Sequence, residues 1–145
     1  MEFCRVMPNI TETEAKQYSP LVLAYIGDCV YELYVRTRVI SEHPTMPAHK
    51  LHLQTVKYVK AQAQSHSIHT MLDTLTEDEQ SVFRRGRNAK SYTSAKNASI
   101  SDYRHATGFE ALIGYLYLCG KQERMEELMK SAYENALNNS VKIRK

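Results

Sequence analysis

Residues 21–35 read LVLAYIGDCVYELYV, and residues 109–119 read FEALIGYLYLC. Apolar side chains occupy most positions of both stretches, and a helix that is apolar on every side is typical of a protein interior. Each stretch contains one glycine, Gly27 or Gly114. A glycine costs a helix about 1 kcal/mol relative to alanine, so its presence indicates that another backbone comes close. We therefore expect two central helices that cross at these glycines.

Two acidic residues, Asp28 and Glu110, interrupt these apolar stretches. An ionised carboxylate is costly in such surroundings unless it is paired or bound to a metal. If the helices cross at the glycines, both carboxylates converge on one pocket with the oxygen ligands that Mg²⁺ prefers. The alternative is that each acid is neutralised by an arginine, such as Arg36 or Arg104, or faces solvent.

Glu32 follows Asp28 by one helical turn and lies on the same face of the expected helix. Its carboxylate could be a third ligand of the same site. The alternative is an ion pair with Arg36, which lies four positions further on and is the usual kind of partner for such a residue.

Outside these stretches, apolar residues recur three and four positions apart, which is the period of an α-helix. Capping patterns mark three helix starts, at residues 11–14, 19–20 and 76–79. The second of these helices should reach about Ile40, and Gly86 should end the third. Residues 86–100 are then expected to form a loop.

The segment after the loop at residues 43–47 is expected to form one helix. Its inner stripe consists of Leu51, Thr55, Val56, Val59 and Ala63. Gly120 should end the second central helix. The apolar stripe of a last helix runs from Met125 to Ala136, and the polar tail at residues 138–145 should be frayed. The expected fold class is all-α.

The chain has 145 residues, of which 43% are apolar and 24% charged. This composition fits one globular domain over residues 1–145, with a core at about 18–137, and excludes a disordered chain. Cys4, Cys29 and Cys119 lack paired CxxC spacing, so we expect reduced thiols, the last two buried, in the cytoplasm. We expect neither a secretory signal nor a membrane span, because charged residues interrupt the apolar run.

Five basic residues and no acidic one lie between Glu79 and Asp102, although the formal charge of the whole chain is only +3. The stretch RRGRNAKS, at residues 84–91, combines guanidinium and ammonium groups with amide and hydroxyl donors. Such a set suits a loop that follows a sugar-phosphate backbone. The alternative is a solvated basic face without a ligand.

Other kinds of site find less support. The sequence has no glycine-rich phosphate loop, no nucleophile elbow and no HExxH motif, which disfavours nucleotide hydrolases, esterases and zinc proteases. The pairs His49–His52 and His66–His69 could each clamp a metal ion, but no third ligand is suggested nearby. Surface or phosphate-facing histidines are therefore the default interpretation. Among the classes of hydrolase considered, a metal-dependent phosphodiesterase remains.

Three motifs resemble the catalytic domain of the ribonuclease III family, and most closely Mini-ribonuclease III, its small bacterial form without a double-stranded RNA-binding domain. The motifs are LAYIGDCVYELYVR at residues 23–36, FRRGRNAKS at residues 83–91 and YRHATGFEALIGYLYL at residues 103–118. The resemblance covers nearly the whole chain, from about Leu21 to Ala136, and the three motifs together are highly specific.

The resemblance implies an all-helical homodimer that hydrolyses double-stranded RNA endonucleolytically with Mg²⁺, for which Mn²⁺ could substitute. It also implies 5′-phosphate and 3′-hydroxyl products, and Asp28 and Glu110 as the catalytic and metal-binding residues. The implied substrate is the precursor of large-subunit (23S) ribosomal RNA, and a ribosomal protein could assist. The RNA-binding residues that we expect are Arg84, Arg85, Arg87, Asn88, Lys90 and Lys96.

Two positions depart from the larger family. Ribonuclease III has a glutamate one turn before its aspartate and an aspartate one turn before its glutamate, where this chain has Ala24 and Thr107. Half of the carboxylate set is therefore missing, and the number of metal ions per site stays open. The main alternative is a non-catalytic RNA-binding or ribosome-assembly module with the same fold. A purely helical protein-interaction domain is a third interpretation, against which the basic segment argues.

Overall fold

The computed structural model describes residues 9–90 and 99–144, with side chains as far as Ala136. Every element in these ranges is a helix, as the sequence predicts. The elements are α1 (Glu12–Gln17), α2 (Pro20–Glu42), α3 (Ala48–Val59), α4 (Ala61–Met71), the short 3₁₀ helix η1 (Leu72–Thr74), α5 (Glu77–Asn88), α6 (Ile100–Leu118) and α7 (Gln122–Arg144).

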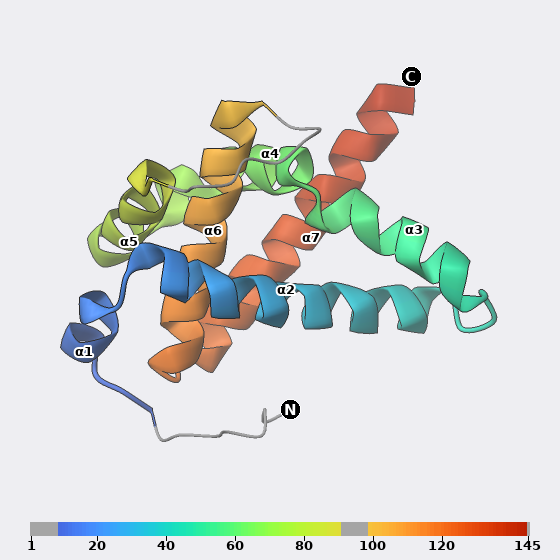
Figure 1. Ribbon diagram of the computed structural model, residues 1–145. Helices are drawn as coiled ribbons and strands as arrows, with labels where there is room; N and C mark the ends of the chain where they lie inside the picture. The colour runs from blue at the N-terminus through green and yellow to red at the C-terminus, as the bar shows by residue number, and fades with distance from the viewer. Residues whose placement is uncertain (1–8, 91–98, 145) are drawn as a thin grey trace.

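α6 lies at the centre of the fold, because it is apolar on almost every side. Its residues from Ala106 to Leu116 are buried, with Glu110 as the exception. α2, α4, α5 and α7 each pack against α6, and Figure 1 shows α2 crossing it. The side chains of Phe109 and Leu112 are completely enclosed. The prediction of an interior helix is therefore confirmed for the second apolar stretch.

α2 is buried on one side only, so the same prediction is wrong for the first apolar stretch. Leu23 and Val35 are completely buried, whereas Tyr25 is 81% exposed. The sequence reads as apolar on every side because the open side of α2 also carries apolar residues. Asp28 and Cys29 lie on exposed positions as well, which corrects the prediction that this carboxylate and this thiol are buried.

The helices begin at the predicted caps. Both predicted capping boxes, at residues 11–14 and 76–79, are complete. Ser19 accepts a hydrogen bond from the backbone N–H of Leu21 at 3.2 Å, so the predicted start of α2 is confirmed. Gly120 follows α6 with a φ of 71°, a backbone conformation that glycine adopts without strain.

The predicted end of α5 is wrong. The helix continues through Gly86 to Asn88, so residues 86–88 are not a loop. Gly86 does not end the helix but lets α5 pack closely on α6. A Cβ atom at this position would lie 2.9 Å from the Cα atom of Gly108 on α6. The basic residues Arg84 and Arg87 therefore lie on a helix.

Two further helix ends differ from the prediction. The expected helix after residue 47 is divided at Lys60, whose ψ of 152° is extended. The Gln64 side chain donates to the carbonyl oxygen of Val59 at 2.8 Å and so satisfies an acceptor that the break frees. At the other end of the chain, α7 continues to Arg144 through the tail that we expected to be frayed, because no glycine or proline interrupts it. Within the described ranges, no helix has the length and apolar character to cross a membrane.

Candidate active site

α2 and α6 cross with their backbones in contact, at the two glycines that the sequence singles out. A Cβ atom on Gly27 would overlap the carbonyl oxygen of Glu110, and a Cβ atom on Gly114 would overlap that of Leu23. Only glycine lets the two helices approach so closely. The predicted crossing is therefore confirmed.

The crossing brings Asp28 and Glu110 together. Glu110 is partly buried, and its carboxyl group is hydrogen-bonded to that of Asp28. Burial, this hydrogen bond and the charges of Asp28 and Glu32 raise the pKa of Glu110 from 4.5 to about 9. Without a cation, Glu110 therefore holds a proton at neutral pH.

Arginine does not neutralise this pair among the described residues. The ion pairs within residues 9–90 and 99–136 include none with Asp28 or Glu110. Arg36 contacts Glu32 instead, with 3.5 Å between Nη2 and Oε1, and Arg104 is exposed. The alternatives to a metal site were neutralisation by an arginine and exposure to solvent. Of these, only the exposure of Asp28 is observed.

The two carboxyl groups suit a divalent cation of the Mg²⁺ type. Mg²⁺ is usually held by one or two carboxylates and keeps several water molecules, so a hydrogen-bonded pair of carboxyl groups with one exposed member has the right chemistry. Residues 9–90 and 99–136 contain no group of three His, Cys, Asp or Glu side chains placed to hold a metal ion. Water and substrate oxygens are suitable further ligands for a cation between Asp28 and Glu110.

Binding of a divalent cation is expected to release a proton. Because the pKa of Glu110 is about 9, a cation at neutral pH must displace about one proton from this carboxyl group. Below the pKa the proton competes with the cation, so affinity should fall as the pH falls, by up to about tenfold per pH unit. Calorimetry of Mn²⁺ binding in two buffers with different ionisation enthalpies measures the number of protons released. Identical heats in both buffers and a pH-independent affinity would contradict the prediction.

The expected RNA-binding residues follow one another along α5 and past its end. Arg84 and Asn88 are exposed one turn apart on the helix, and Lys90 is exposed just after it. Lys96 lies outside the described residues. The three described side chains present donors to solvent, as contact with a phosphate backbone requires.

Two of the expected RNA-binding residues make contacts within the protein. Arg85 donates to the backbone carbonyl oxygens of Lys16 and Tyr18, at 3.0 and 3.4 Å, and thereby binds the end of α1. The Arg87 Nε donates to Asn88 at 3.2 Å, and the Arg87 guanidinium lies 5.8 Å from the centre of the Phe83 ring. These contacts limit where the two guanidinium groups can lie.

Comparison with known proteins identifies the family. A model of the ribonuclease III domain matches residues 21–121. The Mini-ribonuclease 3 of Clostridium tetani is 54% identical over 134 residues, which cover 90% of this chain and 89% of that protein. The chain belongs to the ribonuclease III family. Within it, the chain groups with the Mini-ribonuclease 3 proteins: that of a Thermoanaerobacter species is 49% identical, with 90% and 91% of the two chains covered.

The fold of this chain also resembles that of a solved structure. A crystal structure of a Fusobacterium nucleatum protein matches with a TM-score of 0.73 and 26% sequence identity, and covers 81% of this chain and 93% of that one. Together with the domain match, this similarity confirms the predicted all-helical, ribonuclease III-like fold.

The two departures from the ribonuclease III carboxylate set leave neutral residues in the site. Ala24 and Thr107 are each only 8% exposed. The Thr107 hydroxyl donates to the carbonyl oxygen of Tyr103 at 2.9 Å, so its proton is committed to the backbone of α6. Neither position supplies a negative charge to Asp28 and Glu110.

Sequence reasoning missed one surface of this ribonuclease III domain. Exposed side chains form a stripe along α2, made of Val22, Tyr25, Cys29, Leu33 and Ile40. Their spacing of three, four or seven positions places them on one face of the helix. The sequence signal for this surface was a second set of apolar residues with helical spacing, at other positions of α2 than the buried set. We call this face the α2 stripe.

Proposed function

We propose that this chain, an endoribonuclease by family, cleaves double-stranded RNA with Mg²⁺ bound by Asp28 and Glu110. The observation that carries the proposal is the hydrogen bond between these two carboxyl groups at the crossing of α2 and α6. The two acids come from distant parts of the sequence, and burial together with the nearby Asp28 raises the pKa of Glu110 strongly. Such shifts are concentrated at functional sites. Mn²⁺ would serve as a substitute.

The residues of the chain would position the reacting groups. When bound, Mg²⁺ supplies polarisation of the scissile phosphate and activation of the attacking water. The close contact of α2 with α6 fixes the two carboxyl groups relative to each other, and the exposed side of Asp28 is open to an RNA phosphate. Hydrolysis in this arrangement would leave 5′-phosphate and 3′-hydroxyl ends.

The RNA would be recognised by its shape and its phosphates. A-form RNA hides its base edges in a deep, narrow major groove, so sequence preference should be weak. We propose that the duplex runs along α5 and the segment after it, where the basic residues lie. The proposed contacts are Arg84, Arg85, Arg87, Asn88, Lys90 and Lys96. The substrate would be precursor 23S ribosomal RNA, with a ribosomal protein as a helper.

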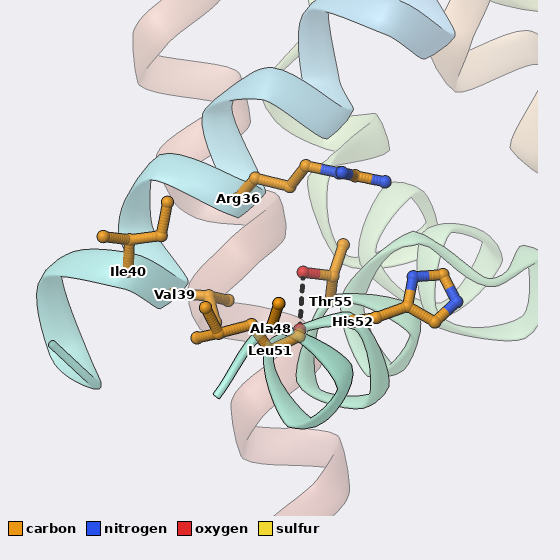
Figure 2. Close-up of a pocket in the computed structure, with 7 residues that line it drawn as sticks. All are labelled: Arg36, Val39, Ile40, Ala48, Leu51, His52 and Thr55. Atoms are coloured by element: carbon orange, nitrogen blue, oxygen red, sulfur yellow. Dashed lines mark hydrogen bonds between the residues drawn. The ribbon is translucent and has the colours of Figure 1, made fainter. Parts of the chain in front are cut away.

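A homodimer would form through the α2 stripe. Exposed apolar side chains that gather on one helix face can mark contact with another molecule, and a two-fold axis would bury the α2 stripe against its own copy. A pocket of about 160 Å³ between α2 and α3 adjoins the stripe, with Val39, Ile40 and Leu51 among its apolar walls (Figure 2). A cavity of about 150 Å³ can hold a benzene ring, so this pocket has room for an apolar side chain of the partner. Each of the two active sites could then cut one RNA strand.

Tyr25→Asp should make the chain monomeric. Tyr25 is 81% exposed in the single chain, and two-fold symmetry would place the new charge twice in the same interface. Sedimentation measures the state of association. The control is Leu53→Asp, which changes another exposed apolar residue, 62% exposed but on α3. A wild-type monomer, or equal effects of the two variants, would contradict a dimer through the α2 stripe.

The experiment that tests the function is incubation with duplex RNA, with and without Mg²⁺. The proposed enzyme yields fragments with 5′-phosphates only when the cation is present. A non-catalytic RNA-binding module is the second candidate, because Ala24 and Thr107 remove two carboxylates of the family set. Such a module would retard the RNA in a gel and leave it intact under both conditions.

We also propose that residues 1–145 act as one catalytic domain and that the protein works in the cytoplasm. Cys29 and Cys119 are free thiols in the structure, which suits a reducing compartment.

A further inference from the structure

Glu32 lies next to the proposed metal site and has no assigned role. It is four residues after Asp28 on α2, which corresponds to one turn and about 6 Å along the helix axis. Its charge contributes to the raised pKa of Glu110, so its electrostatic field reaches the pair of carboxyl groups. Glu32 is thus the next negative charge that a cation at this crossing would meet along α2.

The ion pair of Glu32 is too weak to hold the carboxylate in place. The distance from Oε1 to Arg36 Nη2 is 3.5 Å, and the two side chains are 39% and 55% exposed. Exposed pairs of this i, i+4 kind contribute about 0.3–0.5 kcal/mol. The contact with Arg36 therefore leaves Glu32 free to turn toward a cation.

The site lacks the charge that Glu32 could supply. Ala24 and Thr107 occupy the positions one turn before Asp28 and Glu110, and both are neutral. As its side chain lies, Glu32 does not join Asp28 and Glu110 as a third ligand, because residues 9–90 and 99–136 contain no group of three His, Cys, Asp or Glu side chains placed to hold one metal ion. A contact through water fits, because Mg²⁺ in proteins retains several water molecules.

We propose that Glu32 is a positioning residue of the metal site, which accepts hydrogen bonds from water molecules that the cation retains. It would thereby replace part of the carboxylate set that is absent at positions 24 and 107. This inference rests on the proposed function. Groups that act on a metal ion through its ligands commonly change its affinity about 10- to 100-fold when they are removed.

The test compares Glu32→Gln with Arg36→Met. Both variants remove the same ion pair, but only the first removes the carboxylate. Calorimetry with Mn²⁺ on the RNA-free protein should give about 10- to 100-fold weaker binding for Glu32→Gln and unchanged binding for Arg36→Met. The melting temperatures of the cation-free variants should be alike. Equal cation affinities in the wild type and Glu32→Gln, or an equal loss in both variants, would overturn the inference and leave Glu32 as a structural partner of Arg36.

A second measurement separates this inference from the proposed function. The Mg²⁺ concentration that gives half-maximal cleavage of duplex RNA should rise for Glu32→Gln, while cleavage at saturating Mg²⁺ changes less. If the wild type neither binds Mn²⁺ nor requires Mg²⁺, the proposed function fails. If the wild type requires Mg²⁺ and Glu32→Gln has the same requirement, only the role of Glu32 fails.

Discussion

Asp28→Asn should abolish cleavage of duplex RNA while the protein still folds and binds the RNA. Asparagine keeps the shape of the side chain but removes the charge that would hold the cation together with Glu110. A metal ion contributes several kcal/mol of transition-state stabilisation, and a loss of about 4 kcal/mol lowers the rate about a thousandfold. Single-turnover cleavage at saturating Mg²⁺ measures the rate, and a gel shift measures RNA binding.

The matched control for this variant is Asp73→Asn. Asp73 is an exposed carboxylate on η1, outside the crossing of α2 and α6, so the same chemical change there should leave cleavage at the wild-type rate. Circular dichroism should give the wild-type helix content for both variants, because Asp28 is exposed and its loss leaves no cavity. Undiminished cleavage by Asp28→Asn would refute the assignment of the active site.

Gly27→Ala should destabilise the protein strongly, although alanine is the better helix former. Helix propensity alone would favour the variant by about 1 kcal/mol. The added methyl group would, however, overlap the backbone carbonyl of Glu110, which can yield only if α6 moves away from α2. Overpacking a well-packed core typically costs about 1–3 kcal/mol, and we expect about 3 kcal/mol or more here because the obstacle is backbone. Urea denaturation measures the free energy of unfolding.

The control for this variant is Thr37→Ala, at an exposed position of the same helix, where we expect a change within about 0.5 kcal/mol. Gly27→Ala should also lower the cleavage rate under conditions in which the protein remains folded, because it separates Asp28 from Glu110. An equally stable Gly27→Ala variant would mean that the helices do not meet at this point.

Features that depend on the neighbouring residues alone could be predicted from the sequence. A capping box is complete within four residues, so the starts of α1 and α5 follow directly from the pattern. The helix crossing was also predictable, because Gly27 and Gly114 are expensive in helices and imply a close backbone. The meeting of Asp28 and Glu110 then follows from their positions, since Asp28 adjoins Gly27 and Glu110 lies one helical turn before Gly114.

Features that depend on the surroundings of a helix could not be predicted in this way. Gly86 reads as a helix terminator, but its role is set by Gly108 on another helix. The division at Lys60 also has no glycine or proline to mark it in the sequence. Hydropathy also does not distinguish a side chain buried in the core, such as Leu23, from one exposed on the α2 stripe, such as Tyr25.

Three consecutive residues of α2 point in three directions: Gly27 against α6, Asp28 toward Glu110, and Cys29 outward on the α2 stripe. A single inserted or deleted residue would turn the rest of the helix by about 100° and misdirect every later side chain at once. Homologous chains should therefore vary in amino-acid type along this segment but keep its length constant. Length differences should instead gather in the connection at residues 43–47, which joins α2 to α3.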